Sequence, residues 1–172
     1  MDRLWAPWRL AYVTATDRST ECIFCDAAAH LDAELVLLRG RQAFVILNLY
    51  PYNNGHLMVV PVRHIRTLAD LTSDEQVELM AMARWSELAL TEVYKPQGFN
   101  VGINLGKAAG AGIDDHLHLH VLPRWAADTN FITSIGETRV LPEDLAQTAA
   151  RLRPVFERFA QQGAQERGSE GA

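Results

Sequence analysis

Three histidines that alternate with apolar residues are the part of the sequence best suited to chemistry: His116, His118 and His120. On a β-strand, successive side chains point to opposite faces, so the three imidazoles would share one face while Leu117 and Leu119 point to the other. Burying three imidazoles side by side is costly unless they have partners. Two chemistries fit the pattern: metal ligation, and nucleophilic catalysis on phosphorus in which one imidazole attacks while its neighbours orient it and bind phosphate oxygens.

The residues around the histidines favour phosphate chemistry. Asn104, Gly106 and the segment 110–112 are small or polar, with backbone N–H groups accessible to an anion, and Arg124 adds positive charge. The common nucleotide-binding loops are absent, because no G-x-G-x-x-G occurs and Lys107 is not followed by Ser or Thr. Any phosphate chemistry therefore depends on the histidines themselves.

Two other classes of function compete with this interpretation. A metal-dependent hydrolase could share one ion among the three histidines, but the outer two lie about 13 Å apart at Cα on a straight strand and converge poorly. A nucleotide-binding module without turnover would still bind AMP after loss of His118, and it would form no covalent adduct. Chelation and a search for the adduct separate these classes.

The composition is that of a compact globular domain. Of 172 residues, 48% are hydrophobic and 22% charged, and a chain of this length can fold without disulfides. The net charge of −5 argues against a nucleic-acid polymer as the main partner. The sequence lacks a signal-peptide pattern and an apolar run of membrane-spanning length, so we expect a cytoplasmic location and no membrane partner.

Cys22 and Cys25 are too few and too close for a disulfide framework, and a C-x-x-C by itself is redox-active or incidental.

A set of β-rich segments and two helices must position these residues. Strands are predicted at 34–38, 43–50, 56–62, 99–105 and 116–122. The order of strands, helix, strands and helix favours an α+β fold with an antiparallel sheet. An aromatic arm is predicted at 1–20 and a frayed polar tail at 163–172, which leaves 21–162 as the domain.

The two helices are predicted from their caps and apolar spacing. Ser73 is the candidate N-cap of the first helix, Gln76 completes a capping box, and Pro96 ends the helix. Its apolar stripe is Leu79, Met82, Leu88 and Val93. The last helix begins near 141–143, with apolar residues at helical spacing: Leu145, Leu152, Val155, Phe156 and Phe159.

Several motifs together resemble one family. They are the run 116–122 followed by Pro123-Arg124, the turn 48–51, the segment 55–61 and the segment 98–104. Over about residues 21–125 this ensemble resembles the histidine-triad (HIT) superfamily of nucleotidyl hydrolases and transferases. The segments 4–9, 123–125 and 128–131 resemble, more narrowly, its bacterial branch of diadenosine tetraphosphate phosphorylases (ATP adenylyltransferases).

The resemblance implies a HIT-like α+β fold: a five-stranded antiparallel sheet with two main helices, the sheets of two chains pairing in a homodimer. It also implies a nucleotidyl transferase that converts diadenosine tetraphosphate and phosphate to ATP and ADP through a covalent adenylyl-histidine. A hydrolase of dinucleoside polyphosphates or nucleotides in the same superfamily is the alternative. The implied partners are small nucleotides (the dinucleoside polyphosphate, AMP, ADP and ATP) and inorganic phosphate.

The resemblance also implies roles for individual residues. His118 would be the nucleophile, His120 would contact phosphate oxygens and assist the leaving group, and His56 would orient the triad from behind. The implied nucleotide-binding positions, besides His120, are Asn48 at the ribose hydroxyls and Asn104, Gly106 and Gly112 at the phosphates. The sequence departs from the family at Ile113, where many members carry Ser or Thr, so a hydroxyl near the leaving group is missing.

A structural zinc ion is the one cofactor that the resemblance implies. Its ligands would be Cys22, Cys25, His64 and His116. Two thiolates and two imidazoles complete a tetrahedral Zn²⁺ site with no open position, which is typical of a structural role. No organic cofactor is expected.

Overall fold

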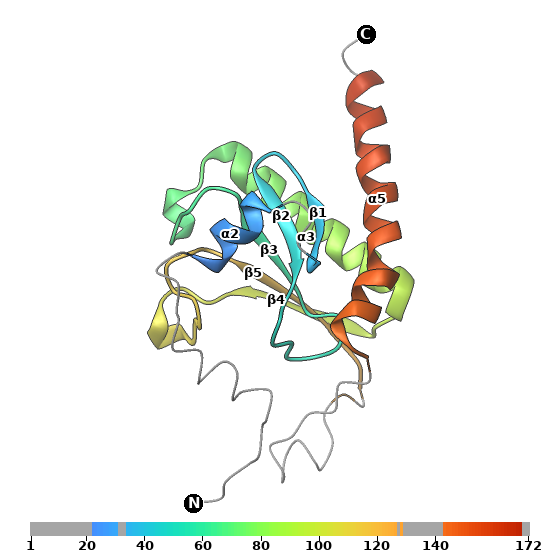
Figure 1. Cartoon of the computed structure of the whole chain (residues 1–172), viewed down its shortest axis with the longest axis horizontal. Helices are drawn as coiled ribbons and strands as arrows, with labels where there is room; N and C mark the ends of the chain where they lie inside the picture. The colour runs from blue at the N-terminus through green and yellow to red at the C-terminus, as the bar shows by residue number, and fades with distance from the viewer. Residues whose placement is uncertain (1–21, 31–33, 127, 129–142, 170–172) are drawn as a thin grey trace, which may run out of the picture.

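The structure, a computed structural model, describes residues 22–30, 34–126, 128 and 143–169 (Figure 1). The strands are β1 (Val36–Arg39), β2 (Ala43–Leu47), β3 (Leu57–Pro61), β4 (Gly98–Ile103) and β5 (Leu119–Arg124). The α-helices are α2 (Ile23–Ala29), α3 (Ser73–Tyr94) and α5 (Leu145–Ser169), and the short 3-10 helices are η1 (Leu68–Asp70) and η2 (Lys107–Ala109). The aromatic arm predicted at 1–20 lies outside the described residues.

The strands form one antiparallel sheet in the order β1-β2-β3-β5-β4. This confirms the α+β class and the five-stranded sheet. Because β5 pairs with both β3 and β4, the histidine segment enters the sheet between two neighbours, with Met58 opposite His120 on one side and Gly102 opposite it on the other. β4 is an edge strand.

The two main helices cover one face of the sheet. α3 packs against β2, β3 and β5, while α5 packs against β1 and α3 (Figure 1). The alternation of β2 divides the core, because Val45 and Leu47 face the helices whereas Phe44 and Ile46 belong to a second apolar cluster on the other face. That second cluster contains Phe24 of α2, so α2 lies on the face opposite α3 and α5.

The first long helix begins one residue earlier than predicted at its cap. Thr72, not Ser73, is the N-cap, and its side chain accepts a hydrogen bond from the backbone N–H of Glu75, which completes the capping box in place of Gln76. The burial of Glu75 is tolerated because Arg63 donates to its carboxylate from both Nε and Nη2, each at 2.8 Å. Glu75, which Arg63 holds in place, thus determines that Thr72 is the N-cap.

Parts of the predicted helices also differ from the structure. Leu88, assigned to the apolar stripe of α3, is 40% exposed, and its neighbours Ala89 and Leu90 are buried instead. The last helix, α5, continues to Ser169, beyond residue 162, and its C-terminal part extends past the sheet (Figure 1). Among the described residues, no helix combines the length and the apolar character needed to cross a membrane.

Candidate active site and metal centre

The three histidines share one face of the sheet, as predicted. Leu117, Leu119 and Val121 lie in the core beneath the helices, so the alternating imidazoles point to the face of α2. All three histidines are buried, and the ring centroids of His118 and His120 are 4.9 Å apart. The strand itself begins only at Leu119, because the backbone N–H of Leu117 donates to the carbonyl of Ile65 rather than to a ladder partner.

A backbone carbonyl fixes the tautomer of His118. Its Nδ1 lies 2.9 Å from the carbonyl oxygen of His116. A carbonyl can only accept a hydrogen bond, so Nδ1 carries the proton and Nε2 of the neutral ring keeps its lone pair. The ring of Phe24 packs against this imidazole, with centroids 5.1 Å apart. In the neutral ring of His118 the free lone pair is therefore on Nε2, the tautomer a nucleophile needs.

A chain of hydrogen bonds fixes the opposite tautomer in His120. The backbone N–H of Tyr52 donates to Nδ1 of His56 at 3.1 Å, and the side-chain amide of Asn48 lies 3.2 Å from the same nitrogen. Nδ1 of His56 is thus an acceptor, and the proton of this ring lies on Nε2, which is 2.9 Å from Nδ1 of His120. His120 accepts there and carries its own proton on Nε2.

Both rings of this pair are neutral at physiological pH. Burial, followed by the nearby rings of His120 and His118, lowers the pKa of His56 to about 3. Burial and the neighbouring His118 lower the pKa of His120 to about 4. His120 therefore offers an N–H donor without carrying a positive charge.

Two cysteines and two histidines converge at the other end of the triad. The ligand atoms of Cys22, Cys25, His64 and His116 all lie within 4.8 Å of one another. Nδ1 of His116 is 3.2 Å from Sγ of Cys22 and 3.7 Å from Sγ of Cys25, and Nδ1 of His64 is 3.2 Å from Sγ of Cys25. These separations suit one tetrahedral ion with metal–ligand distances of about 2.0–2.3 Å.

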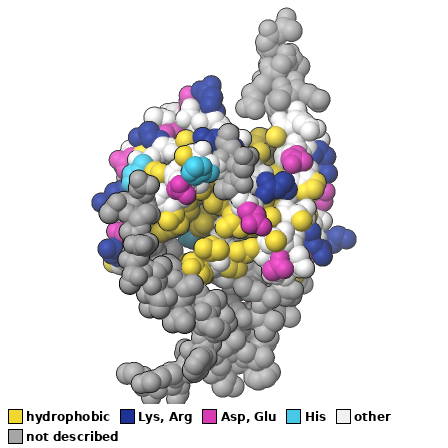
Figure 2. All heavy atoms as spheres, in the orientation of Figure 1, with side chains coloured by type: hydrophobic (Ala, Val, Ile, Leu, Met, Phe, Trp, Pro, Cys, Tyr) yellow, Lys and Arg dark blue, Asp and Glu magenta, His cyan; other side chains and the backbone are white. Residues whose placement is uncertain are grey.

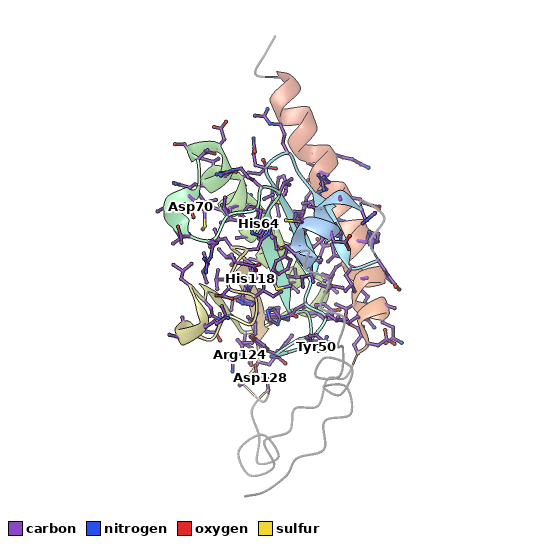
Figure 3. The ribbon with its side chains drawn as sticks, turned by 60° about the vertical axis from the view of Figure 1, so that its left-hand side comes forward. Tyr50, His64, Asp70, His118, Arg124 and Asp128 are labelled. Atoms are coloured by element: carbon purple, nitrogen blue, oxygen red, sulfur yellow. The ribbon has the colours of Figure 1, made fainter. Side chains whose placement is uncertain are left out.

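The surroundings of the cluster also fit a metal ion. Nε2 of His116 lies 2.9 Å from the carbonyl of Pro61 and donates to it, so Nδ1 turns an unprotonated nitrogen toward the thiols. Burial, followed by the adjacent Cys22, raises the pKa of Cys25 to about 11. A bound cation would reverse this effect, because it stabilises thiolates. Figure 3 shows His118 between His64 on one side and Arg124 with Asp128 on the other.

An apolar floor extends from the triad across the sheet. The register places His120 opposite Met58, Met58 opposite Ile46, and Ile46 opposite Val36, so these side chains lie in one row on the histidine face. Figure 2 shows hydrophobic side chains gathered on the face of the molecule seen in Figure 1. A planar apolar group could pack on this floor beside the histidines.

The predicted nucleotide-binding residues are arranged on two sides of the triad. Asn48 is held by His56 and by the backbone N–H of Tyr50, which donates to its Oδ1 at 3.0 Å. Asn104 directly follows β4, whose last residue pairs with Leu119. Gly106, with φ of +81°, starts η2, and Gly112 is an exposed residue of the same connection.

Sequence reasoning did not identify two residues that contact the histidines. Phe24 packs against His116 and His118, and its only sequence signal is an aromatic residue inside the C-x-x-C. Tyr52 supplies the N–H to His56, and its ring lies 5.7 Å from that of His120. The turn before His56 could have indicated this, since turns leave backbone N–H groups without ladder partners.

Comparisons with known proteins agree on one family. The model of the HIT domain matches residues 32–127. The AP-4-A phosphorylase of Mycobacterium tuberculosis is 44% identical over 157 residues, which cover 86% of this chain and 80% of the relative. The asymmetrical bis(5'-nucleosyl)-tetraphosphatase of Schizosaccharomyces pombe is 33% identical over 54% of this chain and 50% of its own length.

A solved structure supports the same assignment. A zinc-bound histidine-triad family protein from Mycobacterium smegmatis superposes with a TM-score of 0.68 at 27% identity, over 84% of this chain and 99% of that chain. The family match, the extent of the similar sequences and the shared fold lead to one conclusion: the chain belongs to the HIT domain family.

Proposed function

We propose that this protein is a nucleotidyl transferase that splits diadenosine tetraphosphate with inorganic phosphate into ATP and ADP through an adenylyl-histidine. The observation that carries this proposal is the pair of opposite tautomers at neighbouring rings: Nε2 of His118 is unprotonated, whereas Nε2 of His120 carries a proton. A nucleophile beside an uncharged donor suits substitution at a phosphate.

In the first half-reaction the lone pair of His118 Nε2 attacks the α-phosphorus. The P–N bond forms while the bond from phosphorus to the bridging oxygen breaks, and its electron pair leaves on ATP. The proton on Nδ1 remains hydrogen-bonded to the carbonyl of His116, which stabilises the imidazolium-like adduct. The Nε2–H of His120 donates to a phosphate oxygen as charge develops there.

In the second half-reaction inorganic phosphate displaces the adenylyl group from His118. Two displacements at the same phosphorus give net retention of configuration. The name of the relative from M. tuberculosis, a phosphorylase, supports phosphate as the acceptor. Water as the acceptor would make the protein a hydrolase, the alternative that the name of the S. pombe relative supports.

The nucleoside would lie across the apolar floor. A base packed on Ile46 and Met58 would place its ribose near Asn48 at the end of β2 and its α-phosphate at the histidines. Asn104, Gly106 and Gly112 would then lie on the side of the remaining phosphates. His56 acts as a positioning residue, because it reaches the substrate only through His120.

We also propose that Cys22, Cys25, His64 and His116 hold zinc, as the family member from M. smegmatis holds zinc. Bound zinc would join α2 to the start of the histidine segment and would play no chemical part in the reaction. Since both cysteines are free thiols, this role suits the reducing cytoplasm.

A homodimer is the proposed assembly. The edge strand β4 offers unpaired backbone groups, and its Val101 side chain is 51% exposed. Pairing of two β4 edges would join the sheets of two chains. It would also cover an edge strand that could otherwise pair with strands of unrelated proteins.

Intact-mass spectrometry tests the proposed function. Incubation with diadenosine tetraphosphate in phosphate-free buffer should add one adenylyl group to the protein, and the His118→Ala variant should gain none. Addition of phosphate should then discharge the adduct with formation of ADP. AMP formed at the same rate with and without phosphate would identify a hydrolase, and turnover by His118→Ala at the parent rate would refute the mechanism.

A further inference from the structure

Two cations from separate parts of the chain converge on one carboxylate near the triad. Nη2 of Arg66 lies 3.5 Å from Oδ2 of Asp114, and Nζ of Lys107 lies 3.9 Å from its Oδ1. Arg66 also donates from Nε to the backbone carbonyl of Asp114 at 3.4 Å. Asp114 thus lies between the two cations, and the three side chains together carry one net positive charge.

The cations flank the segment that carries the nucleophile. On one side, the carbonyl of Ile65 accepts the backbone N–H of Leu117 at 2.6 Å, so Arg66 lies directly beside the histidine segment. On the other side, Ile103 pairs with Leu119, and the chain continues from there to Lys107. Both cations are therefore at the His116 end of the triad, on the side of the proposed phosphate positions.

A cavity of about 380 Å³ lies between the two flanks. It is lined by Arg66, Thr67, Asp70, Leu105, Gly106 and Asp114. Asp70 adds a second carboxylate to this lining, and the backbone N–H and the hydroxyl of Thr67 donate to it at 3.0 and 2.8 Å. Arg66 and Lys107 are 61% and 82% exposed, so their remaining N–H groups are available to an incoming anion.

We propose that Arg66 and Lys107 form a subsite for a phosphate group beyond the α-phosphate. This inference rests on the proposed function and extends it. The group comes either from the distal end of the dinucleoside polyphosphate in the first half-reaction or from inorganic phosphate in the second. Both are multiply charged oxyanions, which guanidinium and ammonium groups bind by charge-assisted hydrogen bonds.

For inorganic phosphate the chemistry balances without a further reagent. An oxygen of the hydrogenphosphate dianion attacks the adenylyl phosphorus, a P–O bond forms, the P–N bond breaks, and its electron pair returns to Nε2 of His118. The phosphate keeps its proton, which leaves with ADP. The cations orient the dianion and reduce its repulsion with the adenylyl group.

Separate assays of the two half-reactions test the subsite. Lys107→Gln and Arg66→Gln are compared with the parent and with Arg41→Gln, a matched control whose guanidinium is 83% exposed and lies 4.0 Å from the carboxylate of Asp74. The first assay follows adduct formation from diadenosine tetraphosphate without phosphate. The second follows decay of the isolated adduct as inorganic phosphate is titrated.

A subsite for inorganic phosphate predicts that the second-order rate constant of adduct decay falls about tenfold in each variant, the usual effect of losing one charge-assisted contact. A subsite for the distal phosphates predicts the same fall in adduct formation instead. The subsite is refuted if both variants match Arg41→Gln in both assays. A parent protein that forms no adduct refutes the proposed function itself, and the subsite with it.

Discussion

His56 is only 1% exposed, and its burial is tolerated because both ring nitrogens are bonded. The backbone N–H of Tyr52 occupies Nδ1, and His120 occupies Nε2. One backbone group in a turn thus determines which nitrogen of His120 carries the proton, the donor that the proposed mechanism directs at the substrate. The proposed role of His120 therefore depends on groups outside the triad.

We expect His56→Leu to lower kcat about 10- to 100-fold, because His120 loses the donor that fixes its tautomer. The adduct should still form on His118, since its own tautomer depends on the His116 carbonyl. His56→Gln should retain more activity, because an amide can accept from Tyr52 and donate to His120. Steady-state kinetics of both variants check this prediction, and equal losses in Leu and Gln variants would contradict a positioning role.

The lowered pKa values of His56 and His120 predict a loss of stability in mild acid. The folded protein binds fewer protons than the unfolded chain between about pH 4 and pH 6.5, so the free energy of unfolding falls as pH falls through this window. Each ring should contribute about 2 kcal/mol of this loss between pH 7 and pH 5. Above pH 7 the two rings should have little effect.

Urea unfolding at pH 7 and pH 5 measures the effect. The loss in His56→Gln should be smaller than in the parent by about 2 kcal/mol, because one shifted group has been removed. His30→Gln is the control, since the side chain of His30 is 71% exposed and contacts Asp26 only at the surface. A parent-like pH dependence in His56→Gln would show that His56 does not titrate as stated.

At the scale of elements, α2 is a short helix that depends on its contacts with the sheet. It has seven residues, too few to be stable alone, and it contributes Phe24 to the apolar cluster against the histidines. Cys22 and Cys25, in this region, lie close to His64 and His116, which come from distant segments of the chain. A metal ion here would therefore hold α2 against the segment that leads into β5.

We expect one zinc ion per chain by elemental analysis, and less than one-fifth of that in Cys22→Ser or His64→Ala. The melting temperature of these variants should fall by about 5–10 °C, because the metal no longer joins α2 to the sheet. His30→Gln, a variant of a nearby residue outside the cluster, should keep its zinc. Full zinc content in both ligand variants would refute the assignment.

The sequence predicts those features that depend on local alternation. Along 116–121 the apolar residues alternate with histidines, and this alone places the imidazoles opposite the core. The N-cap of α3 differs from the predicted Ser73 because Ser73 and Thr72 are both good caps, and the choice depends on Glu75 being held by the distant Arg63. Local patterns cannot resolve such a competition.

Contacts between distant segments could not be predicted either, because local sequence patterns do not show which segments come together. His56 and His120 are 64 residues apart, and no local pattern indicates which nitrogens face each other. The meeting of Arg66 and Lys107 at Asp114 likewise depends on how β3 and β4 lie on either side of β5. The family resemblance supplied the positions of the site residues but not their hydrogen-bond directions.

At the scale of the whole molecule, the sheet has two different edges. β1 packs against α5, whereas β4 carries exposed side chains and, within the part of the chain that the structure describes, pairs with β5 alone. An exposed edge strand favours pairing with another chain. Because β4 leads directly into Asn104 and the η2 loop, a second chain paired at this edge would also lie close to the active site.

We therefore expect Val101→Glu to convert a dimer into a monomer, because two-fold pairing of β4 edges would bring the new carboxylates close together and bury them. Val77→Glu on α3 is the matched control: this valine is 71% exposed, and its replacement should leave a dimer intact. Sedimentation equilibrium of the parent and both variants gives the masses. A parent monomer would refute the dimer, and dissociation by Val77→Glu alone would move the interface from the sheet edge to the helix.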